Sequence, residues 1–176
     1  MSDSLQTLLD KQSLHELVLN YCRACDRRDY ALVRDLYHDD AVDDHGDMFR
    51  GSADEYAAWL PTVLENFEAT AHSISNALFV VNGDRAEGEI YALAYHRTPA
   101  PAARAIVIGG RYLDRYEKRG GEWRFARRSL AMDWCRVEAV DSAAYAEFAA
   151  GAPAGRPDAQ DPSYRVLDMF RRRSEI

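Results

Sequence analysis

Cysteine is scarce in this chain, which has three cysteines among 176 residues. Their odd number and low density argue against a disulfide framework. Two of them, Cys22 and Cys25, form a C-x-x-C pair. A redox pair of this kind sits where a strand leads into a helix, whereas this pair lies inside a helical pattern. We therefore interpret both thiols as packing residues.

Long apolar runs are also missing, since no stretch approaches the roughly 20 residues that a membrane span needs. Residues 1–6 show neither the basic start nor the apolar segment of a secretory signal. Acidic residues outnumber basic ones by 29 to 22, and the net charge of −7 disfavours nucleic acid and anionic lipid as partners. We expect a cytoplasmic protein with no membrane or nucleic-acid partner.

The length of 176 residues fits a single domain. We place this domain at residues 1–150. Residues 151–162 are rich in Gly, Ala and Pro and are interpreted as a linker, and residues 164–173 as a short terminal helix.

The first part of the chain has a helical period. Apolar residues recur at three- and four-residue spacing from Leu14 to Cys25, and Ser52 with Glu55 forms a capping-box pattern. Three helices are predicted, over residues 13–27, 30–37 and 52–68. A turn at His38 ends the second helix.

From about residue 71 the hydrophobic period changes to two. Four strands are predicted, over residues 71–81, 86–96, 104–119 and 122–137. Asn82-Gly83 is a hairpin signal, and Gly109-Gly110 favours a bend inside the third of these strands. Helices followed by antiparallel strands predict an α+β domain, with a pocket between the helices and a bent sheet.

Two titratable residues stand among apolar neighbours. Asp26 lies at the end of the first predicted helix, and His72 lies at the start of the first predicted strand. A carboxylate bonded to one imidazole nitrogen fixes the tautomer that leaves the other nitrogen free to accept a proton. If the fold brings the two residues together, His72 is a candidate general base that Asp26 orients.

Strand alternation separates two arginines of the last predicted strand. Arg128 is predicted to share a face with Leu130 and Trp134, and Arg127 with Phe125. A cation on an apolar face is the more unusual arrangement, so Arg128 is a candidate site residue. The same alternation predicts one shared face for His72, Ile74, Asn76, Leu78 and Val80.

A stretch rich in acidic residues and histidine follows the second predicted helix. It contains His38, Asp39, Asp40, Asp43, Asp44, His45 and Asp47. These side chains can ligate metals, but no H-x-x-x-H or comparable spacing is present, and solvated turns are favoured. For His96, a position on a pocket rim and a position on the surface stay open. No metal and no cofactor are predicted.

Several of these stretches resemble a known family, the SnoaL-like domains of the nuclear-transport-factor-two-like superfamily. The resemblance covers roughly residues 5–137 and is carried by YCRACDRRD at residues 21–29, the strand that begins at His72, IVIGGRYLDRYE at residues 106–117 and GEWRF at residues 121–125. It implies a cone-shaped, cystatin-like α+β barrel whose N-terminal helices pack on a strongly curved, mainly antiparallel sheet around a pocket. It also implies a homo-oligomer, either a trimer or a dimer.

Within this family, the pattern is most similar to hexachlorocyclohexane dehydrochlorinase and to the bile-acid and scytalone dehydratases. The resemblance implies that Asp26, His72 and Arg128 are catalytic, with Arg128 assisting departure of the leaving group. Tyr21 stands where the dehydrochlorinase has a lysine, and is similar instead to the tyrosine that assists loss of water in the bile-acid dehydratase. The implied substrate is a small hydrophobic, cyclic molecule.

Elimination chemistry is consistent with these four residues. It needs a base and, opposite the base, a group that stabilises negative charge. Tyr21 can donate a hydrogen bond to a departing hydroxyl or a carbonyl, and Arg128 can stabilise developing charge without a cofactor. We expect a cofactor-independent lyase, of the dehydratase or dehydrohalogenase type, or an isomerase. Two alternatives stay open: a non-catalytic small-molecule-binding protein, and a structural subunit similar to the dioxygenase β subunit.

Overall fold

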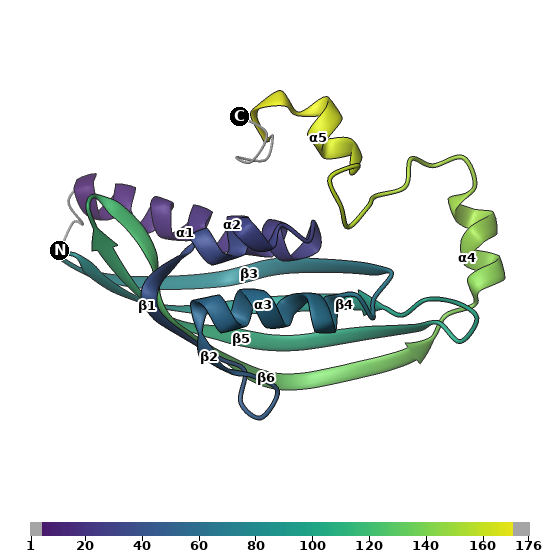
Figure 1. Ribbon diagram of the computed structural model, residues 1–176, viewed down its shortest axis with the longest axis horizontal. Helices are drawn as coiled ribbons and strands as arrows, with labels where there is room; N and C mark the ends of the chain where they lie inside the picture. The colour runs from purple at the N-terminus through teal and green to yellow at the C-terminus, as the bar shows by residue number, and fades with distance from the viewer. Residues whose placement is uncertain (1–4, 171–176) are drawn as a thin grey trace.

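The computed structural model describes residues 5–170, which form helices over one curved sheet (Figure 1). The helices are α1 (Leu5–Asp26), α2 (Tyr30–Asp35), α3 (Ala53–Leu64), α4 (Ser142–Ala149) and α5 (Pro162–Val166), with a 3-10 turn at Asp168–Phe170. The strands are β1 (Tyr37–Asp44), β2 (Arg50–Ser52), β3 (Ala69–Asn82), β4 (Arg85–Arg97), β5 (Arg104–Arg119) and β6 (Glu122–Ala139). The α+β class and the helices packed on a curved sheet are thus confirmed.

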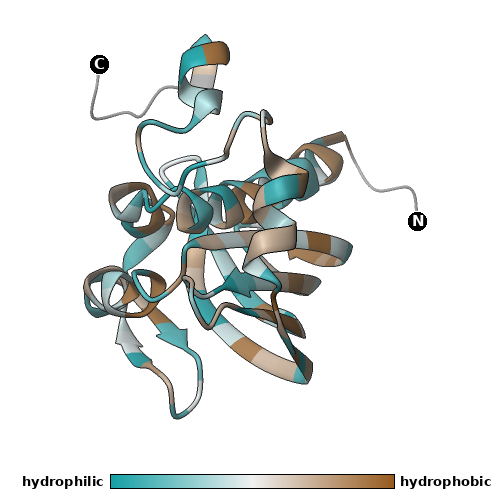
Figure 2. Cartoon of the chain, turned by 90° about the vertical axis from the view of Figure 1, so that its right-hand side faces the viewer, coloured by the Kyte–Doolittle hydropathy of each residue, from teal (hydrophilic) through white to brown (hydrophobic). Residues whose placement is uncertain are grey.

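The sheet has six strands in the order β2-β1-β6-β5-β4-β3. Strands β3 to β6 pair as an antiparallel meander, and β1 joins its edge parallel to β6. Helices α1, α2 and α3 cover one face of the sheet and leave the other face open. Hydrophobic and hydrophilic residues alternate along the helices and strands (Figure 2), as is common where one face of an antiparallel sheet is covered.

The three helices predicted before residue 71 are all present, but not all of their bounds are correct. Helix α3 starts where the capping box predicts, since the Ser52 hydroxyl accepts from the Glu55 backbone N–H and the Glu55 carboxylate accepts from that of Ser52. It ends at Leu64, before residue 68. Helix α1 starts at Leu5, well before residue 13. Leu8 and Leu9 in its first turns are exposed.

Strands β1 and β2 are absent from the sequence prediction, which has a turn at His38. Tyr37, His38, Ala41 and Asp43 are the buried positions of β1, so one of them is a carboxylate. An aspartate at a buried position conceals the alternation by which a strand is recognised. The acidic stretch is therefore strand as far as Asp44, and His45 and Asp47 lie in the turn that follows.

Two bulges overturn the predicted strand faces. The register of β3 shifts between Ile74 and Ala77, so Leu78 and Val80 are 68% and 72% exposed while His72 stays on the inner side. The register between β5 and β6 shifts next to Phe125, which places Phe125 and Arg128 on the same buried face. An extra residue in a strand reverses every side chain beyond it, and alternation alone does not reveal where it lies.

The predicted bend at Gly109-Gly110 coincides with a third register shift, opposite Met132 and Trp134. The Trp134 ring lies directly over Gly109, with its nearest atom 2.2 Å from the place that a Cβ would take. Any side chain at position 109 would displace this indole. The glycine therefore permits the close contact between β5 and β6.

Arg128 lies in the centre of the core. Its Nε and Nη2 donate to the two carboxylate oxygens of Asp114 at 2.9 and 2.7 Å, and both side chains are fully buried. The guanidinium is 4.0 to 4.2 Å from the ring centres of Tyr21, Tyr112 and Phe125. Helix α1 thus packs on the sheet through a buried cation enclosed by aromatic rings.

The end of the chain packs back on α1. Residues 150–161 contain neither helix nor strand, and α4, which was not predicted, precedes them. Helix α5 covers only the start of the helix predicted at 164–173, and residues 171–173 lie outside the described residues. Asp161 lies 3.2 Å from Arg27, the residue directly after α1, and Arg23 of α1 donates to the Tyr164 hydroxyl at 3.3 Å. Within residues 5–170, no helix has the length and apolarity needed to cross a membrane.

The Arg128–Asp114 pair predicts a large effect on stability. Replacing Asp114 with Asn leaves the buried guanidinium without its counter-charge, and we expect the free energy of unfolding to fall by about 3–5 kcal/mol. Glu89→Gln is the matched control, because it breaks the exposed pair with Arg111 and is expected to cost less than about 1 kcal/mol. Urea unfolding measures both, and equal losses in the two variants would contradict this account.

Candidate active site

Asp26 and His72 meet between the end of α1 and the start of β3. The Asp26 Oδ1 atom lies 2.7 Å from His72 Nδ1, and Oδ2 accepts the backbone N–H of His72 at 2.9 Å. The two side chains are 13% and 10% exposed. Both carboxylate oxygens therefore bind one residue, which fixes the position of the strand as well as the orientation of the imidazole.

Arg28 fixes the chain on both sides of this contact. It follows the end of α1 in the left-handed region, at φ 54°. Its guanidinium donates to the carbonyl oxygens of Cys25, Leu64 and Phe67 and to the Thr70 hydroxyl, at 2.7 to 3.3 Å. One side chain thus ties the ends of α1 and α3 to the start of β3, two residues before His72.

The electrostatics of the pair favour an ionised carboxylate. Burial raises the pKa of Asp26, but the hydrogen bonds and charge of His72 together outweigh it and hold this pKa below its usual value. An ionised Asp26 accepts the Nδ1–H of the ring. His72 Nε2 has no hydrogen-bond partner within residues 5–170, so in this tautomer it presents an available lone pair.

His96 is the neighbour of His72 on the next strand. The two rings lie 5.5 Å apart, edge to face, and the Phe67 ring packs against His96 at 4.7 Å. Burial, and then the nearby charge of His72, lower the pKa of His96 to about 4. Its Nδ1 is buried without a hydrogen-bond partner among the described residues. His96 is therefore a half-buried, neutral imidazole of the site rather than a surface residue.

Tyr21 and Arg128 form a second cluster within the core. The Tyr21 hydroxyl lies 2.5 Å from that of Tyr56 on α3, and the Tyr21 ring covers Arg128. Burial raises the pKa of the Tyr21 phenol well above its usual value, so it remains a proton donor. Among the described residues, no hydrogen bond or ring contact joins Tyr21 or Arg128 to Asp26 or His72. The structure thus places the four predicted residues in two separate pairs, each with one member on α1 and the other on the sheet.

The cysteines of the C-x-x-C pair are buried and free. Burial raises the pKa of Cys22 to about 12 and raises that of Cys25 as well. Thiols that stay protonated are poor nucleophiles. Packing, as the sequence predicts, accounts for both.

The acidic stretch is distributed among separate contacts. His38 bonds the Glu117 carbonyl, Asp40 pairs with Arg119, and Asp44 pairs with Arg127. Within residues 5–170, no group of three or more potential ligands is arranged to hold a metal ion. Two further members of the acidic stretch, Asp43 and His45, bond to each other.

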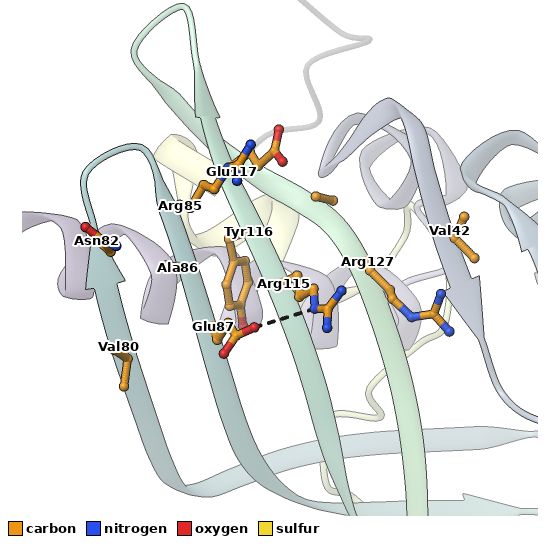
Figure 3. A pocket seen from close by; sticks show the side chains of 11 residues that line it. Val42, Val80, Asn82, Arg85, Ala86, Glu87, Arg115, Tyr116, Glu117 and Arg127 are labelled. Carbon is orange, nitrogen blue, oxygen red and sulfur yellow. Dashed lines mark ion pairs between the residues drawn. The ribbon is translucent and has the colours of Figure 1, made fainter.

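A cavity of about 710 Å³ lies over the strands, and its lining does not include Asp26 or His72 (Figure 3). Arg115 and Arg127 border it, together with Glu87 and Val80. Arg115 is paired with Glu87 at 3.5 Å, and Arg127 is already paired with Asp44. Both of these arginines are thus already paired with a carboxylate.

The chain is thus an α+β protein with helices over a curved mixed sheet and a carboxylate–imidazole pair where α1 meets β3. A family model described as SnoaL-like domain matches residues 6–129. The chain belongs to this family, as the sequence resemblance predicts.

Known relatives share this fold at low sequence identity. An uncharacterised protein of Mycobacterium tuberculosis is 24% identical over 127 residues, which are 71% of this chain and 86% of that protein. A candidate scytalone dehydratase from Novosphingobium aromaticivorans has a TM-score of 0.68 at 23% identity, covering 76% of this chain and 91% of its own. Hexachlorocyclohexane dehydrochlorinase LinA-type3 from Novosphingobium barchaimii has a TM-score of 0.67 at 18% identity, covering 80% and 96%.

The lowered pKa of His96 predicts a pH-dependent loss of stability. An imidazole with a pKa of about 4 in the folded chain and near 6.5 in the unfolded chain binds more protons when unfolded, so stability falls as the pH drops through this window. Between about pH 7 and pH 5 we expect the native chain to lose roughly 2 kcal/mol more than a His96→Gln variant. Urea unfolding at both pH values tests this, and parallel losses would contradict it.

Proposed function

We propose that this protein is a cofactor-independent lyase of the dehydratase or dehydrohalogenase type, or an isomerase, in which His72 is the general base. The observation that carries the proposal is the double contact of Asp26 with the ring and the backbone of His72. It supplies an oriented imidazole with one nitrogen held by a carboxylate and the other available. The named activities of the dehydrochlorinase and the candidate dehydratase support the same reaction class.

The reaction begins when His72 Nε2 removes a proton from carbon. The electron pair of the broken C–H bond forms a carbon–carbon double bond as the leaving group departs with its own bonding pair. A departing hydroxide takes up the proton that His72 removed and leaves as water, whereas a halide leaves as the anion and the imidazolium releases its proton to solvent. In an isomerase, the imidazolium returns the proton to another carbon. Asp26 stabilises the imidazolium in every case.

The other residues act around this proton transfer. Tyr21 is proposed to donate a hydrogen bond to the leaving group or to a carbonyl that carries the developing charge. Arg128 is proposed as a positioning residue that acts through the Tyr21 ring, because its own charge is engaged by Asp114. His96 is neutral at its pKa of about 4, so it adds no competing cation beside His72.

The surroundings of His72 support a small hydrophobic, cyclic substrate. Phe67 packs beside His96, and Ile74 follows His72 on the inner side of β3. These apolar groups offer a ring substrate hydrophobic contact, while the polar atoms are concentrated at the two imidazoles. These apolar side chains beside a localised base support the proposed substrate class.

The role of His72 is tested with His72→Asn. An asparagine amide can keep the bond to Asp26 but lacks the distant nitrogen, so we expect turnover to fall by about 100-fold or more while folding is retained. A β-hydroxy cyclic ketone and a chlorinated cyclohexane serve as probes, with elimination and deuterium uptake followed by NMR in heavy water. His15→Asn, on α1 and outside the site, is the matched control.

Two outcomes contradict this role. Equal rates in the native chain and in His72→Asn would show that another group removes the proton. Saturable binding of the probes with neither elimination nor deuterium uptake would favour the binding-protein alternative.

We further propose that the chain forms a homo-oligomer, a dimer or trimer, in the cytoplasm. The open face of the sheet supports this, since it exposes apolar side chains on neighbouring strands. They include Leu78, Val80, Leu93, Leu113 and Trp134. The free thiols agree with a reducing compartment.

Leu93→Glu tests the oligomer. A carboxylate in the middle of the apolar face is expected to separate the copies, so light scattering should give two or three chain masses for the native protein and one mass of 19.9 kDa for the variant. Leu8→Glu, on the exposed side of α1, should leave the mass unchanged. A native mass of 19.9 kDa would contradict the proposal.

A further inference from the structure

The acidic stretch contains a second carboxylate–imidazole pair that the proposed reaction does not use. Asp43 Oδ1 lies 2.6 Å from His45 Nδ1, and Asp43 is fully buried while the His45 side chain is 12% exposed. The pair lies at the end of β1 and the start of the turn to β2. It repeats the arrangement of Asp26 and His72, with a carboxylate oxygen beside the Nδ1 atom of an imidazole.

The second oxygen of Asp43 is also occupied. The Tyr37 hydroxyl donates to Asp43 Oδ2 at 2.8 Å. Burial, and then the charge of Asp43, raise the pKa of Tyr37 well above its usual value, so this phenol remains a donor. Asp43 is thus held on one side by a permanent donor and presents its other oxygen to the imidazole.

Asp43 lies beside a buried ion pair of the sheet. In the sheet register, Asp43 of β1 is level with Arg128 of β6, which is level with Asp114 of β5. Arg128 donates two hydrogen bonds to Asp114 and none to Asp43 among the described residues. The hydrogen bonds of the Asp43 carboxylate are therefore those with Tyr37 and His45.

Aromatic rings surround the other side of His45. Its ring stacks on Tyr56 at 5.3 Å and lies 6.2 Å from Trp59, and Phe49 stacks on Trp59 at 5.0 Å. The backbone N–H of His45 donates to the Phe49 carbonyl at 2.7 Å, which closes the turn. Phe49, Trp59 and His45 are each only partly buried. A hydrogen-bond acceptor thus lies beside two partly accessible aromatic faces.

We propose that His45, Phe49 and Trp59 form a second binding site, which takes a ring compound that carries a hydroxyl group. The hydroxyl donates to His45 Nε2, which has no hydrogen-bond partner within the described residues, and the ring packs on the aromatic side chains. A histidine whose only role was to close the turn would need the hydrogen bond to Asp43 but not the aromatic side chains around its ring. The site does not depend on turnover at His72.

Phenol and toluene are the probes, because they differ by one hydroxyl group. In NMR titrations of the full chain, phenol is expected to shift the His45 Nε2 and Trp59 indole signals saturably. Toluene is expected to bind about fivefold or more weakly, since the difference is one hydrogen bond. Equal affinities for the two probes, or no saturable shift at Trp59, would overturn the proposal.

His45→Asn provides the matched variant. Its amide can keep the bond to Asp43 and hence the turn, but it lacks the outer nitrogen, so phenol should bind no more tightly than toluene does to the native chain. The free energy of unfolding, measured in parallel, verifies that the variant is folded. In His72→Asn, the phenol-induced shifts at Trp59 should persist. Unchanged phenol affinity in His45→Asn, or loss of the Trp59 shifts in His72→Asn only, would show that no separate site exists at His45.

Discussion

The contact between Asp26 and His72 is the constraint on which the active-site geometry depends. It joins the last residue of α1 to the third position after the start of β3, and it engages both oxygens of one carboxylate. Hydrogen bonds that involve a charged partner are stronger than neutral ones, particularly where water is excluded. The same contact therefore aligns a helix with a strand and selects the imidazole nitrogen that remains available. Structure and chemistry at this position have a single physical origin.

The core places a second demand on the sequence, because it contains charge as well as aromatic rings. Arg128 is neutralised by Asp114 and enclosed by rings, and Asp43 lies next to it on the neighbouring strand. A buried carboxylate without a donor is costly, so Tyr37 and His45 are required as partners of Asp43. The charged groups inside this fold form small paired sets, although Arg128 Nη1 and His96 Nδ1 have no hydrogen-bond partner among the described residues. Imidazoles lie where two of these sets approach the surface.

Much of this arrangement can be predicted from the sequence, for identifiable reasons. The capping box at Ser52, the hairpin at Asn82-Gly83 and the bounds of β5 follow from local patterns, and so does the choice of Asp26 and His72 as titratable residues among apolar ones. The bulges in β3 and β6 do not follow, because an inserted residue changes the face of later side chains without changing composition. Strand β1 was not predicted, because Asp43 occupies a core position. The nearness of His96 to His72 depends on the pairing of β3 with β4, which local patterns do not reveal.

The protonation pattern of the His72 ring tests the central claim most directly. Nitrogen chemical shifts of the imidazole, measured by NMR near neutral pH, distinguish a protonated from a bare nitrogen at each position. The account predicts that the neutral form of the ring carries its proton on Nδ1 and leaves Nε2 bare in the native chain, and that this preference is lost in Asp26→Asn. A native ring with its proton on Nε2, or a pattern unchanged by Asp26→Asn, would contradict it.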